Sequence, residues 1–194
     1  MLLNILPSEV AEELKEKGKS DAKYFEETTV LFSDFIAFTT ISELLSPSEL
    51  VAEINHCFKA FDGIMEKYGV EKIKTIGDAY MAVGGLSQGR SSGPKEVILA
   101  ALEMQAFMRA RKANHLAKGL PAFDMRIGIH SGPVVAGIVG LKKFQYDIWG
   151  DTVNTASRME SSGEMGKVNI SKASYERVQE LDLFHFETRG MVEV

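Results

Sequence analysis

Helix-like and strand-like spacing of apolar residues alternate along the chain, and turn residues mark where one changes to the other. The clearest helix start is Ser-Pro-Ser-Glu at 46–49, which combines a Ser cap, a Pro at the first helical position and a Glu three residues after the cap. Apolar residues then recur three and four positions apart until Gly69, where we predict that the helix ends. A second helix is predicted from about 95 to 115, and a third from Thr152, with Asp151 as its cap.

Strand-like segments surround these helices. We predict strands at 28–33, 70–76, 79–84, 123–130 and 134–139. Gly77 and Asp78 have the composition of a tight hairpin turn, and Ser-Gly-Pro at 131–133 separates the last two strands. The order β-α-β-β-α-β predicts an α/β (α+β) sandwich with a ferredoxin-like core, in which helices lie on one face of a largely antiparallel sheet. Short strand and helix pieces are predicted after this core.

Residues 1–20 predict a short amphipathic helix. Its apolar side has no obvious partner within the segment and consists of Leu2, Leu3, Ile5, Leu6, Val10 and Leu14. Two interpretations stay open from the residues alone: a helix that packs on the domain, or a connector to a preceding part of a longer protein. Further along, residues 84–94 predict a Gly/Ser loop, which lacks the Gly-Lys-Ser/Thr of a P-loop.

Length and composition restrict the function classes. The chain has 194 residues, the size of one domain with a substantial core. Its net charge of -5 and pI near 5.5 argue against a nucleic-acid partner, whose site would be basic. The single cysteine, Cys57, excludes an internal disulfide and a cysteine zinc cluster, and it favours a reducing, cytoplasmic location. No apolar run approaches the ~20 residues of a membrane span, and an anchor elsewhere in a longer protein stays open.

Two aspartates stand where strand-forming runs end. Asp34 follows the predicted strand 28–33, and Asp78 follows residues 72–77. Carboxylates at the ends of neighbouring strands can hold paired divalent cations, which neutralise charge during chemistry on a nucleotide phosphate. The turn after Asp34 can offer backbone N–H groups to a phosphate. Taken singly, each aspartate is more simply explained as a turn or cap residue.

Asn154 and Arg158 are four residues apart on the third predicted helix, so they project from one face. An amide and a guanidinium on an exposed face are often only solvated. They are also the groups that can orient a sugar and stabilise charge on a phosphate.

These motifs occur in order at separated places, and together they resemble the catalytic domain of class III nucleotidyl cyclases. The resemblance is carried by the segments 30–39, 71–83, 126–140 and 145–163. It covers nearly the whole chain from about Thr28 onward, and residues 2–7 are similar to the helical connector of receptor-type cyclases. It therefore implies a helical connector at 1–24, a catalytic domain at 25–194, and a sensor or receptor domain upstream in the full protein.

The resemblance implies roles for the residues around the first aspartate. Asp34 and Asp78 match the two metal-binding aspartates, and the backbone carbonyl of Phe35 adds a ligand. Phe38 and Thr39, in the turn that follows, match positions that bind substrate. The implied cofactors are two divalent cations, either Mg²⁺ or Mn²⁺.

A second set of roles falls on the third helix. Asn154 matches the residue that orients the ribose, and Arg158 matches the one that stabilises the α-phosphate in the transition state. In this family the metal ligands come from one catalytic domain, and the base, ribose and arginine contacts come from the other. Because this chain carries both sets, the resemblance predicts a homodimer with two equivalent shared sites.

The base-selecting positions of the family match Lys74 and Asp147. Adenine presents an acceptor at N1 and a donor at its exocyclic amine, which a Lys donor and an Asp acceptor complement. Guanine presents the reverse pattern, and each buried mismatch costs roughly 1–3 kcal/mol. We therefore predict an adenylate cyclase that converts ATP to 3′,5′-cyclic AMP and pyrophosphate by a two-metal mechanism. Without the resemblance, Lys74 would be an exposed strand lysine and Asp147 a structural cap.

Two alternatives stay open. One is a guanylate cyclase that makes cyclic GMP, and the other is a catalytically silent domain that binds nucleotide or only dimerises. The sequence also ends at Val194, before the Lys-Gly-Lys-Gly segment in which family members place a triphosphate-binding lysine. A truncated C-terminal end of this kind is expected to slow turnover and to leave most nucleotide binding intact.

Overall fold

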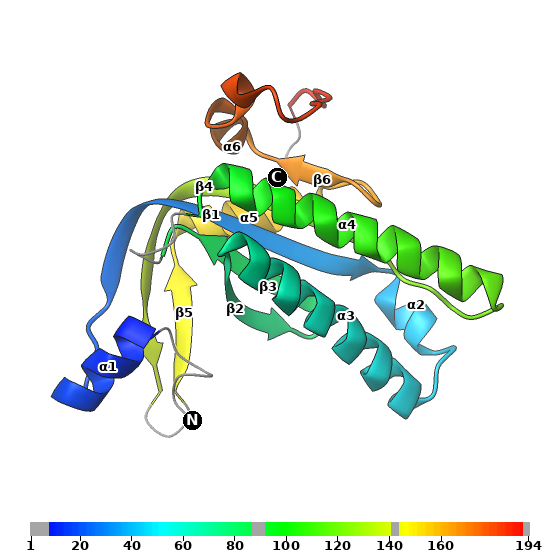
Figure 1. The fold of residues 1–194 in the computed structure, drawn as a ribbon, viewed down its shortest axis with the longest axis horizontal. Helices are drawn as coiled ribbons and strands as arrows, with labels where there is room; N and C mark the ends of the chain where they lie inside the picture. The colour runs from blue at the N-terminus through cyan, green and yellow to red at the C-terminus, as the bar shows by residue number, and fades with distance from the viewer. Residues whose placement is uncertain (1–7, 87–91, 141–143, 192–194) are drawn as a thin grey trace.

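The helices and strands follow one another nearly as the apolar pattern predicts (Figure 1). A computed structural model describes residues 8–86, 92–140 and 144–191. The elements are α1 (Ser8–Lys17), β1 (Lys23–Ile36), α2 (Phe38–Ser42), α3 (Pro47–Tyr68), β2 (Glu71–Ile76), β3 (Ala79–Gly84), α4 (Pro94–Ala117), β4 (Asp124–Val139), β5 (Gln145–Trp149), α5 (Asp151–Ser161), β6 (Val168–Ile170), α6 (Lys172–Glu176) and the 3-10 helix η2 (Gln179–Leu181). Parts of the predicted connector helix and Gly/Ser loop, and the last three residues of the chain, lie outside the described residues.

The strands form one sheet in the order β2-β3-β1-β4-β5, and β6 pairs with β4. All pairs are antiparallel except β4–β6. The elements β1, α3, β2, β3, α4 and β4 make up the predicted ferredoxin-like core, so the predicted fold class is confirmed.

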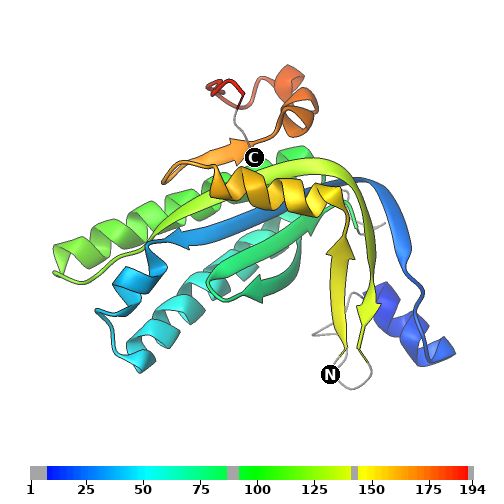
Figure 2. The same ribbon diagram turned by 180° about the vertical axis from the view of Figure 1, so that it is seen from behind.

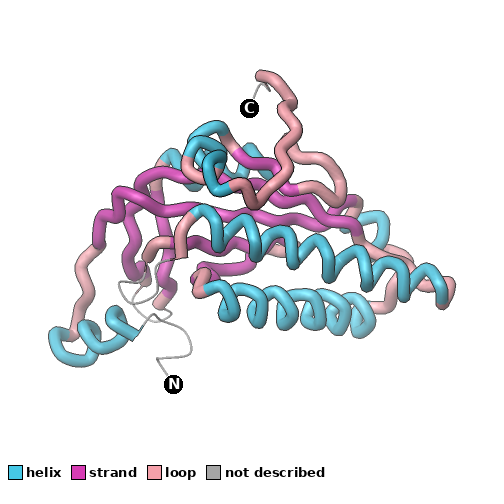
Figure 3. Tube along the Cα trace, turned by 45° about the horizontal axis from the view of Figure 1, so that its top comes forward, coloured by secondary structure: helices cyan, strands magenta, loops and turns pink. Residues whose placement is uncertain are grey.

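The two faces of the sheet contact different apolar clusters, because successive strand residues point to opposite sides. On β1, Leu31 and Phe35 belong to the cluster beneath α3 and α4, whereas Val30 and Phe32 belong to a second cluster with α1 and α5. Figure 1 shows α3 and α4 in front of the sheet, Figure 2 shows α5 on the opposite side, and Figure 3 shows α3 and α4 running side by side. The expectation that helices lie on one face therefore holds for α3 and α4, and α1 and α5 add a partial layer on the other.

The ends of α3 are those that the sequence predicts. The Ser46 hydroxyl accepts a hydrogen bond from the Glu49 N–H at 3.3 Å, and the Glu49 carboxylate accepts one from the Ser46 N–H at 2.8 Å. These reciprocal bonds form a capping box. Gly69 ends the helix with a φ of 66°, a left-handed conformation that favours glycine.

The prediction of two strands at 123–130 and 134–139 is wrong, because β4 runs unbroken from Asp124 to Val139. Pro133 has no N–H to give to a neighbouring strand. The register shifts between Phe25 and Thr28, so that two residues of β1 stand opposite the proline. Because of this β-bulge in β1, no ladder hydrogen bond is needed from Pro133, and β4 continues through the proline.

The prediction that Asp151 caps the third helix is also wrong. The cap position of α5 is Gly150, whose φ of 142° lies in the range that favours glycine, and Asp151 is the first helical residue. The segment before it, Gln145–Trp149, forms β5, which the sequence analysis did not assign as a strand.

Helix α1 packs on the domain. Val10 and Ala11 are buried in the second apolar cluster, and Leu14 packs against it. Glu13 accepts a hydrogen bond from Ser20 at 2.9 Å and pairs with Lys17. The first of the two interpretations of the N-terminal segment therefore holds for the described residues, and the role of that segment as a connector stays a prediction. None of the helices in the described ranges has the length and apolar character needed to cross a bilayer.

Gly128 marks the closest approach of α5 to β4. A Cβ atom at this position would lie 1.9 Å from the backbone nitrogen of Glu160. We expect Gly128→Ala to lower the free energy of unfolding by about 3 kcal/mol or more in urea denaturation, because backbone cannot move aside as a flexible side chain can. Gly63→Ala in α3 is the matched control, since a Cβ there meets nothing within 4 Å. It should stabilise slightly. Unchanged stability of Gly128→Ala would contradict this close packing.

Candidate active site

Asp34 and Asp78 are brought together by strand pairing. The register places Ser33 of β1 opposite Tyr80 of β3, so that Asp34 lies beside the turn that carries Asp78. Gly77 opens this turn with a φ of 62°, as a two-residue hairpin requires, and the predicted hairpin is confirmed.

The electrostatic surroundings of Asp34 disfavour its charged form. Burial, then the negative charges of Asp78 and Glu160 and a hydrogen bond with Asp78, raise the pKa of Asp34 to about 6. The nearby Arg126 acts in the opposite direction. Two carboxylates at such close range repel one another, and divalent cations relieve that repulsion.

The donor set fits divalent cations that are shared with a substrate. Among the described residues, no group of three or more His, Cys, Asp or Glu side chains is placed to hold a metal ion. Mg²⁺ is typically held by one or two carboxylates together with water and substrate phosphates. Asp34 and Asp78 could supply the carboxylates, and they stay predicted ligands together with the backbone carbonyl of Phe35.

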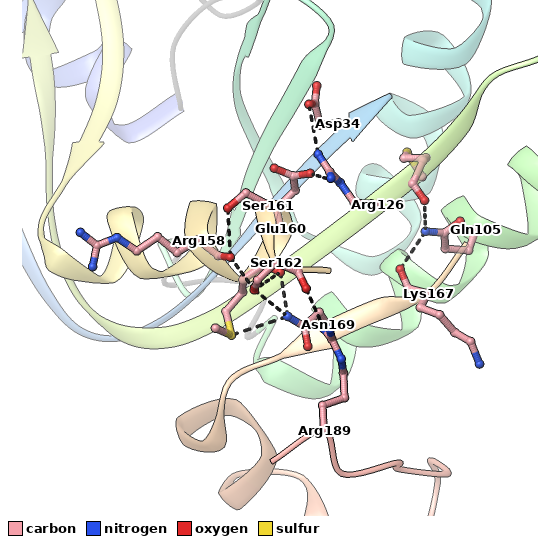
Figure 4. Close-up of polar contacts among 12 residues, drawn as sticks. Asp34, Gln105, Arg126, Arg158, Glu160, Ser161, Ser162, Lys167, Asn169 and Arg189 are labelled. Atoms are coloured by element: carbon pink, nitrogen blue, oxygen red, sulfur yellow. Dashed lines mark hydrogen bonds and ion pairs between the residues drawn. The ribbon is translucent and has the colours of Figure 1, made fainter. Parts of the chain in front are cut away.

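The structure brings two further charged residues to this site, Arg126 and Glu160, and neither is predicted from the sequence. Arg126 stands opposite Asp34 in the β1–β4 register, and its Nη2 lies 3.9 Å from Asp34 Oδ2. Its Nε donates to Glu160 Oε1 at 3.0 Å (Figure 4). Glu160 is buried, and this burial raises its pKa against the effect of the arginine. In the sequence, Arg126 is visible only as a charged residue within a predicted strand. The β1–β4 register that places it opposite Asp34 is not visible in the spacing of apolar residues.

Lys74 and Asp147 form an ion pair, with Nζ and Oδ2 2.5 Å apart. The other carboxylate oxygen, Oδ1, accepts the Ile148 N–H at 2.9 Å. The pair joins β2 and β5, which are the two ends of the strand order. The structure therefore brings together the two residues that the resemblance assigns to base selection, and Asp147 lies within β5, not in a cap.

A β-bulge in β2 explains why Lys74 faces Asp147. The register with β3 shifts between Lys72 and Lys74, which leaves Ile73 as an extra residue. In a regular strand, Lys72 and Lys74 would point to the same side of the sheet, because they are two residues apart. With the bulge, Lys72 bonds to Asp62 of α3 at 3.0 Å, and Lys74 reaches the other side of the sheet.

Asn154 and Arg158 both lie on the exposed face of α5, as their spacing predicts. Figure 4 shows the Arg158 side chain extending away from Asp34 and Arg126, whereas Glu160 points toward them. The predicted catalytic arginine and the predicted metal ligands therefore do not converge within one chain.

Phe38 and Thr39 open the short helix α2, directly after the strand that carries Asp34. Ala37 precedes them with a φ of 55°, which turns the chain sharply out of β1. The Phe38 ring stacks on Phe35 and Phe123, with centroids 6.4 Å and 5.6 Å away. The Phe38 side chain thus serves packing, whereas Thr39 is exposed, and its side chain and the backbone amides that open the helix are available to a substrate.

Comparison with known proteins extends these observations. The sequence pattern of the family described as "Adenylate and Guanylate cyclase catalytic domain" matches residues 20–194. The human atrial natriuretic peptide receptor 2 is 41% identical over 198 residues, which cover 100% of this chain and 18% of the receptor. Human guanylyl cyclase C is 42% identical over 189 residues, which cover 96% of this chain and 17% of that protein. The chain thus spans less than a fifth of the length of these relatives.

A solved structure agrees with the sequence relatives. The catalytic core of a rhodopsin-guanylyl cyclase with converted specificity, in complex with ATPαS, has a TM-score of 0.76 and 36% sequence identity. The match covers 88% of this chain and 93% of that one. These matches confirm the resemblance that was drawn from the separated motifs, and the chain belongs to the family of adenylate and guanylate cyclase catalytic domains.

Proposed function

We propose that this nucleotidyl cyclase acts on ATP and forms 3′,5′-cyclic AMP and pyrophosphate. In this reaction the ribose 3′-oxygen attacks the α-phosphorus, the bond to the bridging oxygen of the β-phosphate breaks, and the 3′-hydroxyl proton is lost. The observation that carries the choice of ATP is the ion pair of Lys74 and Asp147.

The Lys74–Asp147 pair complements the edge of adenine. Asp147 Oδ1 is held by the Ile148 N–H and Oδ2 by Lys74, which fixes the plane of the carboxylate. Each oxygen keeps lone-pair capacity to accept the adenine amine, and the lysine keeps N–H groups for N1. Guanine would set its O6 against the carboxylate and its N1–H against the ammonium, which leaves both charged groups mismatched.

Asp34, Asp78 and the Phe35 carbonyl would hold two divalent cations. When bound, these cations lower the pKa of the ribose hydroxyl and neutralise the triphosphate. Arg126 lies beside Asp34, so its guanidinium is placed to meet a phosphate that reaches this position. Arg158 would stabilise the charge that develops on the α-phosphate, and Asn154 would orient the ribose.

The two sets of residues point away from one another within the chain, which supports a site shared between two copies. A homodimer with two-fold symmetry would place the metal half of each chain against the Asn154 and Arg158 half of its partner. Two equivalent sites would result. A sensor or receptor domain upstream in the full protein would control how the halves meet.

GTP is the second candidate substrate, and the relatives favour it. Guanylyl cyclase C is named for that activity, and the rhodopsin-linked structure is also described as a guanylyl cyclase. Taken alone, these names point to cyclic GMP. The same rhodopsin-linked core, with converted specificity, is in complex with ATPαS, so a closely similar catalytic core can accept an adenine nucleotide.

A turnover assay with ATP and with GTP, each with Mg²⁺ and with Mn²⁺, decides between the candidates. We expect ATP to be preferred by at least about a hundredfold in kcat/KM, because guanine would mismatch two charged groups. Equal or faster formation of cyclic GMP would overturn the assignment based on Lys74 and Asp147 and favour the second candidate. Neither product in any of the four conditions would favour a silent domain.

A further inference from the structure

Arg126 stands between two carboxylates and bonds to the one that is not a predicted metal ligand. Its Nε donates to Glu160 Oε1 at 3.0 Å, while its Nη2 stays 3.9 Å from Asp34 Oδ2. The Glu160 side chain is 10% exposed, against 30% for Asp34. The arginine therefore donates its hydrogen bond to the more buried of the two carboxylates (Figure 4).

Strand pairing alone would direct this arginine to Asp34. The two residues face one another in the β1–β4 register, where opposite charges attract directly. A short hydrogen bond from Arg126, in place of the long ion pair that is present, would occupy the carboxylate that is needed for a divalent cation. Glu160 offers the guanidinium a competing partner from α5, a different element.

We propose that Glu160 is a positioning residue, which holds Arg126 off Asp34 and so keeps the carboxylate open for the cation. The proposal rests on the metal role of Asp34 in the function proposed above. When a triphosphate arrives, Arg126 can turn to it without first breaking a hydrogen bond to Asp34, because the two groups are 3.9 Å apart and share only a long ion pair. Glu160 itself is not part of a metal cluster of three or more acidic, His or Cys side chains within the described residues.

The fold fixes Glu160 for this task. Gly128 lies two residues beyond Arg126 on β4, and its missing side chain lets the backbone of α5 approach at Glu160. The same helix presents Asn154 and Arg158 on its exposed face. Helix α5 thus carries Asn154 and Arg158 of one proposed half-site, and also Glu160, which positions Arg126 in the metal half.

The test measures binding of Mn²⁺ alone by isothermal titration, without nucleotide, so that a contact of Arg126 with a phosphate does not enter the measurement. We expect Glu160→Gln to weaken Mn²⁺ binding about tenfold, because the released guanidinium pairs with Asp34. Arg126→Gln removes the competing cation and should leave Mn²⁺ affinity equal to that of the wild type or higher. Glu164→Gln is the matched control, since Glu164 also pairs with an arginine, Arg189, at 3.3 Å but is 62% exposed. It should change nothing.

A double-mutant cycle separates positioning from a direct charge effect. If Glu160 acts through the arginine, then Glu160→Gln introduced into Arg126→Gln protein should no longer weaken Mn²⁺ binding. An undiminished tenfold loss in that background would overturn the proposal, and so would unchanged Mn²⁺ affinity in the single Glu160→Gln protein. Should Glu160→Gln fail to fold, weaker Mn²⁺ binding in Arg126→Gln would also overturn it. These readouts require no turnover, so a wild type that forms no cyclic nucleotide would refute the proposed function and leave this result standing.

Discussion

Replacing Asp34 by asparagine is expected to lower cyclic nucleotide formation at least about a thousandfold and to leave the fold intact. Asparagine has the same shape, but its neutral amide cannot neutralise a divalent cation. Of the two proposed acidic ligands, Asp78 would then remain. The measurement is kcat at saturating nucleotide over a series of Mg²⁺ concentrations, with Asp21→Asn as the control, because Asp21 is an exposed aspartate outside the site.

Stability gives a second readout for Asp34→Asn. In the fold the pKa of Asp34 is raised to about 6 from an ordinary value of 3.8. The folded state therefore binds the proton more tightly, and stability is lost as the pH rises through the folded pKa. In EDTA the Tm of the wild type should fall more between pH 5 and pH 8 than that of the asparagine protein. Turnover within tenfold of the wild type by a folded Asp34→Asn protein would refute the metal assignment.

Local signals in the sequence predicted most of the fold. The cap at Ser46, the left-handed end at Gly69 and the turn at Gly77 each depend on residues within four positions, and all three are found in the structure. Local signals did not predict that β4 continues through Pro133. Whether a proline breaks a strand depends on a bulge in the neighbouring strand, here in β1, which is about a hundred residues away in the sequence.

The residues of the candidate site could be named from the family motifs, but most of their contacts could not. The pairing of Lys74 with Asp147 depends on the bulge at Ile73, which reverses the side to which the lysine points. The places of Arg126 and Glu160 depend on strand register and on the close approach of α5 to β4. These are properties of packing between distant segments, and the periodicity of one segment does not contain them.

Dimers that contain one Asp34→Asn chain and one Arg158→Ala chain are expected to recover activity that neither variant has alone. If each site takes its metal ligands from one chain and its arginine from the other, then such a mixed dimer has one intact site and one site that lacks both groups. Purification through a different tag on each chain isolates these dimers. Turnover should reach about half of the wild-type value per dimer, provided that the two sites work independently.

The control dimer combines Asp34→Asn with Asp78→Asn. Both changes lie in the metal half, so each of its two sites lacks one carboxylate, and it should stay inactive. Recovery in this control would show that metal ligands are also shared between chains, contrary to the β1–β3 register that places both aspartates in one chain. Failure of the Asp34→Asn and Arg158→Ala dimer to recover would refute the shared site. In that case Arg158, which points away from Asp34 within the chain, would need another role.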